Sequence, residues 1–250
     1  MRLRLTLAAM VLLFAVGAMA EATNILSDVE TQGRQLAQQL CDAQPAENFT
    51  NTGILQIRSS NGSRTNLNFN SQVTVTESNW QSFYYVPLKS ESGIPDSISL
   101  VINSSRNQSH EYLYTPAGAC IPAILKSSET MIPFAGSDFW LADLGLEFFH
   151  WPAQKILPKT TNLKRGREYT LLESTNPNPS TNGYSRVLTW IDKETGGILE
   201  AEAYDYNGKL LKDFAPKSFK KVNGQWQLQE MEIRNVQTGS RTRLDFDLKK

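Results

Sequence analysis

Histidine and cysteine are scarce in this chain of 250 residues, which has only two of each, His110, His150, Cys41 and Cys120. Neither histidine stands at a metal-ligand spacing from another histidine or a cysteine, which argues against a zinc site. The sequence also lacks a Gly-x-Ser-x-Gly nucleophile elbow and a glycine-rich phosphate loop. No nucleophile, base and oxyanion donor can be assembled from what remains. We therefore expect a protein without catalytic function, metal or cofactor.

An excess of charge of either sign is also missing, because 25 lysines and arginines face 25 aspartates and glutamates. A nucleic-acid-binding surface needs a basic excess, and a polybasic membrane patch needs the same. We expect neither. If the chain has protein partners, we expect it to recognise them through apolar surface.

Long hydrophobic runs are absent except at the beginning of the chain. Arg2 and Arg4 precede an apolar run over 5–16, and Ala18-Met19-Ala20 has the small-x-small pattern that signal peptidase cleaves. This pattern predicts a signal peptide over 1–20, cleaved after Ala20. No cysteine follows the cleavage point, which indicates soluble export, and no membrane span is expected in the mature chain.

The two cysteines leave two interpretations open. An oxidising compartment favours a disulfide between Cys41 and Cys120, which would close a long loop and restrict the unfolded chain. The alternative is a pair of buried thiols that never meet, since a sequence does not show how close their Cα atoms come.

The mature chain is predicted to be one mainly β domain of the α+β type over 21–250. An amphipathic helix is expected over 25–43, either as an ordinary cover of a sheet or packed into it. From Thr52 onward, apolar residues alternate with polar ones, and Asn-Gly pairs mark hairpin turns. We expect an antiparallel meander, with strands at 53–59, 64–70, 72–78, 80–87, 97–104, 109–115, 168–174, 184–192, 197–205, 209–215, 218–222, 226–236 and 241–248. The basic stretch 153–168 is read as a solvated crossing segment without a role.

An aromatic segment, 131–152, interrupts this meander. Asp138 is expected to cap a short helix that is apolar around most of its circumference and ends at Pro152. Such a helix would plug or cover a curved sheet. Its rings are either core or a lid that contacts a ligand, and the candidate ligand-contacting residues are Phe139, Trp140, Leu144, Phe148 and Trp151.

Four sequence segments together resemble the outer-membrane lipoprotein-sorting proteins, the LolA-like proteins of the bacterial periplasm. The segments are PFAGSDF at 133–139, VLTWIDKET at 187–195, AYDYNGKLLK at 203–212 and MEIRNVQTG at 231–239. Each motif is weak by itself, and the resemblance rests on their order and spacing.

The resemblance implies an antiparallel sheet curled into an incomplete barrel, with the N-terminal and aromatic helices against its concave face. It implies a periplasmic, non-enzymatic carrier that shelters the acyl chains of a lipoprotein or another lipid, with possible protein partners in the envelope. One alternative is a structural or interaction module whose barrel is filled by its own side chains. The other is an enzyme of a type that the sequence does not reveal.

Overall fold

The computed structural model describes residues 28–89, 96–159, 161–222 and 225–248. The signal peptide expected at 1–20 and the first residues of the expected helix lie outside this range. Within it, no helix is both long and apolar enough to cross a membrane.

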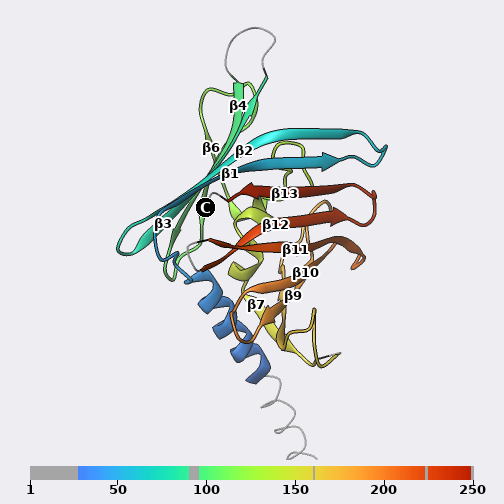
Figure 1. The fold of residues 1–250 in the computed structure, drawn as a ribbon. Helices are drawn as coiled ribbons and strands as arrows, with labels where there is room; N and C mark the ends of the chain where they lie inside the picture. The colour runs from blue at the N-terminus through green and yellow to red at the C-terminus, as the bar shows by residue number, and fades with distance from the viewer. Residues whose placement is uncertain (1–27, 90–95, 160, 223–224, 249–250) are drawn as a thin grey trace, which may run out of the picture.

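One antiparallel sheet of thirteen strands forms the framework, and it is not closed into a barrel (Figure 1). The strand order is β6-β5-β4-β3-β2-β1-β13-β12-β11-β10-β9-β8-β7, so the first and last strands pair in the middle and β6 and β7 form the two edges. The half-barrel expected from the resemblance is confirmed. The strands are β1 (Phe49–Arg58), β2 (Arg64–Val75), β3 (Asn79–Leu88), β4 (Asp96–Ser105), β5 (Glu111–Thr115), β6 (Ala123–Leu125), β7 (Ala153–Leu157), β8 (Tyr169–Thr175), β9 (Arg186–Asp192), β10 (Ile198–Tyr204), β11 (Leu210–Val222), β12 (Gln225–Asn235) and β13 (Arg241–Asp247).

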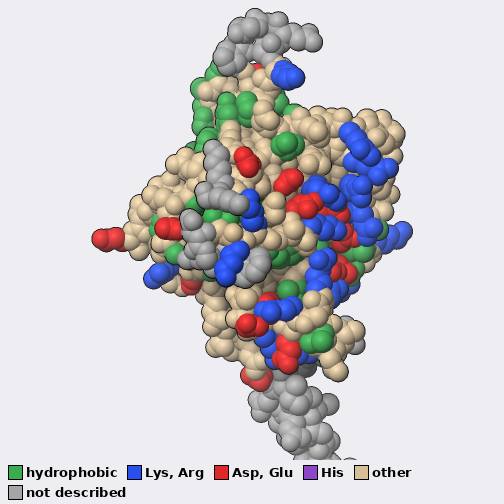
Figure 2. All heavy atoms as spheres, in the orientation of Figure 1, with side chains coloured by type: hydrophobic (Ala, Val, Ile, Leu, Met, Phe, Trp, Pro, Cys, Tyr) green, Lys and Arg blue, Asp and Glu red, His purple; other side chains and the backbone are tan. Residues whose placement is uncertain are grey.

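Alternation along the strands sorts charged and apolar side chains onto opposite faces. On β12, Met231 and Ile233 face the interior, whereas Glu230 and Glu232 form ion pairs with Arg243 of β13. Figure 2 shows basic and acidic side chains interleaved on the face that carries β10 to β13. This pattern is why an antiparallel sheet with one covered face could be predicted.

Two predicted breaks in the sheet are absent, and two strands were missed. β2 continues through Asn70 and Ser71, and β11 continues through Pro216 with a bulge between Pro216 and Phe219. β6 is only three residues long, and β7 lies at the start of the basic stretch that was read as a solvated crossing. Edge strands are often short, and a short strand shows little alternation of apolar and polar residues in the sequence.

The N-terminal helix is confirmed over 28–41 and lies against the lower part of the sheet (Figure 1). Ala37 is buried in an apolar cluster with Phe149 and Trp151. Gly33 allows the close approach, because a Cβ at this position would lie 2.6 Å from the backbone nitrogen of Lys155 in β7. A glycine that weakens the helix is therefore required for its packing.

We predict that Gly33→Ala lowers the free energy of unfolding by about 1–2 kcal/mol, because the overlap with the β7 backbone outweighs the better helix propensity of alanine. Urea denaturation measures the change. Gln35→Ala, on the exposed face of the same helix, is the matched control and is expected to be neutral or slightly stabilising. A stabilised Gly33→Ala variant would contradict the close approach.

The aromatic segment is not the continuous helix that was expected. Pro133 and Trp140 form an isolated bridge that closes a loop over 134–139. The helix α2 (Leu141–Leu144) is a single turn, and Leu146 has a left-handed backbone (φ 50°) that stops it. Two short 3₁₀ turns, η1 (Ser127–Glu129) and η2 (Glu147–His150), flank it. The apolar residues of this segment are therefore buried without forming a continuous helix.

Asp138 does not cap this helix, so that prediction was wrong. The helix begins after Trp140, whose backbone N–H donates to Asp143 Oδ2 at 2.8 Å. The disulfide interpretation also fails, since Cys41 and Cys120 are both free cysteines. Cys41 ends the N-terminal helix and is partly buried, whereas Cys120 is exposed between β5 and β6.

Candidate functional site

A cavity of about 980 Å³ lies between the concave face of the sheet and residues 133–151, which we call the plug. Its walls are mostly apolar and come from both halves of the sheet. The strands contribute Val73, Val187, Ala201, Ala203, Phe214, Met231, Ile233, Leu244 and Phe246. The plug contributes Phe139, Leu144, Leu146 and Phe148. The side chains of the sheet and the plug therefore fill only part of the interior of the half-barrel.

The five side chains predicted to contact a ligand divide into two groups. Phe139, Leu144 and Phe148 line the cavity. Trp151 is buried instead among the residues that pack on the N-terminal helix. Trp140 stacks on Tyr184, with ring centroids 4.5 Å apart. The structure therefore brings three of the five to the cavity and gives the two tryptophans packing positions.

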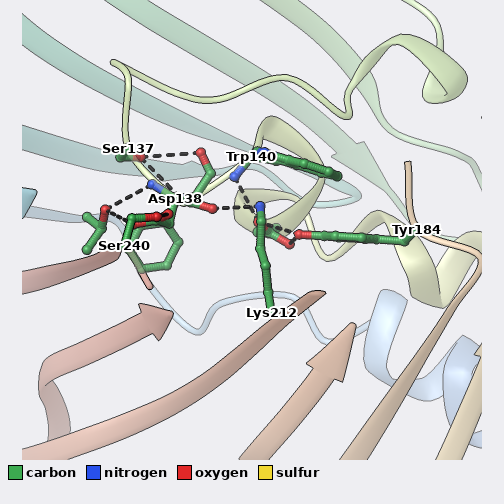
Figure 3. Close-up of polar contacts among 9 residues, drawn as sticks. Ser137, Asp138, Trp140, Tyr184, Lys212 and Ser240 are labelled. Atoms are coloured by element: carbon green, nitrogen blue, oxygen red, sulfur yellow. Dashed lines mark hydrogen bonds and ion pairs between the residues drawn. The ribbon is translucent and has the colours of Figure 1, made fainter. Parts of the chain in front are cut away.

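A buried lysine at the cavity wall ties the plug to the sheet (Figure 3). Lys212 of β11 is 2% exposed, and its Nζ donates to the Asp138 carbonyl at 2.7 Å and to Asp143 Oδ2 at 3.4 Å. The ammonium also lies 3.5 Å from the centroid of the Trp140 ring, a cation–π arrangement. The Tyr184 hydroxyl donates to Asp143 Oδ1 at 2.9 Å. We call Lys212, Asp143 and Tyr184 the latch.

Burial sets the protonation behaviour of the latch. Desolvation lowers the pKa of Lys212 to about 8, although the Asp143 carboxylate acts in the opposite direction. Desolvation and the same carboxylate raise the pKa of Tyr184 well above its usual value. At neutral pH the Lys212 side chain is therefore an ammonium, and the Tyr184 side chain is a neutral phenol.

Asp138 fastens the plug at a second point. Its carboxylate accepts hydrogen bonds from Ser240 Oγ at 2.5 Å and from Thr242 Oγ1 at 2.9 Å, and Thr242 belongs to β13. Thr242 Oγ1 accepts in turn from the Asp138 backbone N–H at 2.9 Å. A residue expected to begin a helix instead joins the plug to the centre of the sheet, as Figure 3 shows.

Solved structures share this architecture at low sequence identity. A domain from Vibrio parahaemolyticus named for outer-membrane lipoprotein sorting has a TM-score of 0.68 and 18% identity, over 88% of this chain and 92% of that one. A DUF1329 family protein from Desulfovibrio piger has 0.67 and 18%, over 88% and 91%. A LolA superfamily protein from Nitrosomonas europaea has 0.58 and 16%, over 88% and 92%. The LolA-like fold is confirmed.

A family model described as that of an uncharacterized protein matches residues 85–248, more than half of the chain. The chain belongs to this family. A comparison with curated protein sequences finds no match. The matched range contains the whole plug and the latch, whereas the N-terminal helix and most of β1 to β3 lie before it.

The far end of the plug is held by a buried carboxylate. Glu147, 2% exposed, accepts a hydrogen bond from the Tyr112 hydroxyl at 2.8 Å and another from the Ser127 hydroxyl. Gly145 leaves room for this contact, since a Cβ there would lie 2.1 Å from the Tyr112 oxygen. Glu147 therefore joins the plug to β5, as the latch joins it to β11.

The two histidines, forty positions apart in the sequence, meet beside this anchor. Their Nε2 atoms are 3.2 Å apart, and His110 Nδ1 lies 3.5 Å from the Tyr112 hydroxyl. They line a second pocket of about 170 Å³ with Cys41. In the part of the chain that the structure describes, no three histidine, cysteine, aspartate or glutamate side chains are placed to hold a metal ion.

Sequence reasoning missed the latch lysine, although a signal was present. Leu210, Lys212 and Phe214 fall on one face of the predicted strand, and Phe214 lines the cavity. A lysine on a core-facing position must find a carboxylate or carbonyl partner. The partner could not be recognised, because the segment that carries Asp143 was expected to be one continuous helix, and only a single turn of helix forms there.

We predict that Asp143→Ala lowers the free energy of unfolding by about 3–5 kcal/mol, because it leaves the Lys212 ammonium buried without its carboxylate. Chemical denaturation measures the loss. The control lies next to the latch lysine: Asp213 pairs with Arg234 at the surface, so Asp213→Ala should cost about 1 kcal/mol or less. Equal losses for the two variants would contradict the latch.

The histidine pair predicts a pH dependence. Burial, and then the charge of His150, lower the pKa of His110 to about 4, whereas the unfolded chain titrates near 6.5. Between these values the unfolded state binds more protons, so stability is present above pH 6.5 and is lost as the pH falls towards 4. The groups around the pair are Tyr112, Glu147 and Asp42, and the two carboxylates oppose the lowering of the His150 pKa.

We therefore expect His110→Gln to lose less stability than the parent between pH 7 and pH 4.5, by up to about 3 kcal/mol. The free energy of unfolding is measured at both pH values for each protein. Comparing the change between pH 7 and pH 4.5 in the variant with that in the parent removes any pH-independent cost of the substitution. An unchanged difference would mean that His110 titrates alike in the folded and unfolded states, and would contradict the lowered pKa.

Proposed function

We propose that the chain is a non-enzymatic carrier of acylated molecules, a lipoprotein or another lipid, in the periplasm. The observation that carries this proposal is the open apolar cavity of about 980 Å³ inside the half-barrel. Its size is at the upper end of the range of small-molecule sites. The family-level resemblance, the export signal expected over 1–20 and the Vibrio domain named for lipoprotein sorting support the same function.

Burial of the acyl chain supplies the affinity. Each methylene removed from water contributes about 0.8 kcal/mol, so ten methylenes contribute about 8 kcal/mol before the cost of immobilising the ligand. Phe139, Leu144 and Phe148 would contact the chain from the plug, and Val187, Ala201 and Met231 from the sheet. This function needs no catalytic group.

Access is better explained by the open rim than by a swinging lid. The plug is fastened by Asp138, the latch and Glu147, and each contact would have to break before the plug could leave the sheet. At the rim, Phe49 and Phe219 line the cavity and are still 42% and 54% exposed. Exposed rings at a cavity mouth give an acyl chain apolar surface to contact on its way in.

A second candidate function is a module that docks an envelope protein. The edge strand β6 favours it, because Ile121 and Ile124 beside and within this strand are 79% and 70% exposed. An apolar sheet edge can pair with an extended segment of a partner. The open cavity favours the carrier, since a module of this kind has no need of a hollow interior.

We predict that Ala201→Trp weakens the binding of a fluorescent fatty acid at least about tenfold, because the indole fills space that the acyl chain would occupy. Fluorescence titration of the purified protein measures binding, and circular dichroism checks the fold. If this variant unfolds, Ala203→Phe gives a smaller obstruction on the same strand.

Ala153→Trp is the matched control, because Ala153 is exposed on β7 and lies outside the cavity wall. It should bind like the parent. Failure of the folded parent to bind any acyl probe would exclude the carrier and favour the docking module.

A further inference from the structure

The rim of the cavity has a cationic side that the carrier function does not by itself explain. Arg165, Arg167 and Lys217 all line the cavity. The two arginines lie in a tight turn, in which the backbone N–H groups of Lys164 and Arg167 each donate to the other residue's carbonyl at 2.9 Å. This turn belongs to the basic stretch that was read from the sequence as a solvated segment.

The sheet has a gap at this position. Pairing between β10 and β11 reaches only to Phe214, whereas β11 continues to Val222 with β12 on its other side. Arg165 Nη1 donates to the Pro216 carbonyl at 2.9 Å, so the turn lies where β10 no longer covers β11. The arginine side chain is thus held at the opening of the cavity.

The backbone of the turn is unfavourable for the residue that occupies it. Arg165 has a φ of 50° and is followed by Gly166 at 77°. Two successive positive φ values are typical of a type I′ turn, in which asparagine and glycine are the preferred residues. An arginine costs conformational energy here, and neither the turn nor the hydrophobic core explains its presence.

The cations at the rim share their carboxylates with other cations. Glu200 binds both Lys164, at 2.8 Å, and Arg165, at 3.4 Å. Glu232 binds both Lys217, at 3.0 Å, and Arg243, at 3.2 Å, and Arg243 also binds Glu230, at 2.7 Å. Neither glutamate lines the cavity. Of the charged residues at the opening that line the cavity, three are cations, Arg165, Arg167 and Lys217, and one is an anion, Asp192, so this side of the lining is mostly positive.

Donor capacity also remains at the rim. Arg165 uses Nε towards Glu200 and Nη1 towards Pro216, and within the described residues Nη2 has no hydrogen-bond partner. Its side chain is 40% exposed. Arg167 differs, because Asp192 and Glu194 both bind it. Arg165, aided by Lys217, is therefore the group that can receive an additional anion.

We propose that Arg165 and Lys217 form a head-group site that selects anionic amphiphiles, with a carboxylate or phosphate at the rim and the acyl chain in the cavity. This assignment rests on the proposed carrier function and names the class of cargo. A guanidinium suits it, because its fork of N–H donors matches the oxygens of a carboxylate or phosphate.

The test compares two probes with the same chain. The full-length protein is expressed, purified without detergent and titrated with a dansyl-labelled undecanoic acid and with its methyl ester. We expect the acid to bind about tenfold more tightly, with a preference that decreases as salt is added. Dodecyl phosphate should displace the acid probe, whereas inorganic phosphate, which has no chain, should not.

Arg165→Asn removes the cation and places a residue in the turn that accepts a positive φ, so this variant should fold as well as the parent. Combined with Lys217→Gln, it should bind the acid as weakly as the ester and leave ester binding unchanged. Arg241→Gln is the matched control, because Arg241 is exposed on β13 and lies outside the cavity wall.

Each result decides the assignment. Equal binding of acid and ester by the parent, or an equal loss of both in the double variant, would overturn the head-group site and leave the carrier standing. Displacement by inorganic phosphate alone would show an anion site that is independent of the cavity and would overturn the assignment as stated. Binding of neither probe by the folded parent would overturn the carrier and this site together.

Discussion

The structure depends on one constraint: the plug is irregular and lies against the concave face of the sheet, so its buried polar groups must find hydrogen-bond partners there. The plug contains only one turn of α-helix, and part of its backbone bonds to side chains outside the segment: the Asp138 N–H donates to Thr242, and the Asp138 carbonyl accepts from Lys212. The buried amide of Gln154 alone donates to the carbonyls of Phe148, Phe149 and Trp151. A buried carbonyl or carboxylate without a partner costs more than a formed bond contributes, so these contacts determine where the plug can lie.

This constraint also produces the cavity. The plug is fixed near β13 by Asp138, near β11 by Asp143 and near β5 by Glu147, and it cannot collapse onto the strands between these points. The space left over is lined by apolar side chains that have no partner across it. A ligand that enters this cavity meets walls that the contacts of the plug already hold in place, and a preorganised site loses less affinity to reorganisation.

The sheet could be predicted from the sequence and the plug could not, for a physical reason. A strand with one covered face shows a period of two, and Asn-Gly turns mark its ends, so most strands and their antiparallel meander were visible in local patterns, whereas the half-barrel came from the family resemblance. The plug takes its shape from partners far away in the sequence, such as Lys212, Tyr184 and Thr242. Its apolar spacing therefore suggested a helix, and Asp138 a cap. The separation of His110 and His150 similarly concealed their contact, and no local signal excluded the bond between the two cysteines.

The polar groups at the wall of the cavity differ from those at its rim, and this difference would orient a bound amphiphile. At the wall, the Lys212 ammonium is compensated by Asp143 and covered by the Trp140 ring, so that wall offers no free charge to a ligand. At the rim, Arg165 lies half exposed, and its carboxylate partner is outside the cavity and shared with Lys164. A charged head group is strongly disfavoured among apolar walls and favoured beside a cation that retains a free N–H donor. Under the proposed carrier function, the acyl chain would enter first and the head group would stay at the rim, within reach of a protein that donates or receives the cargo.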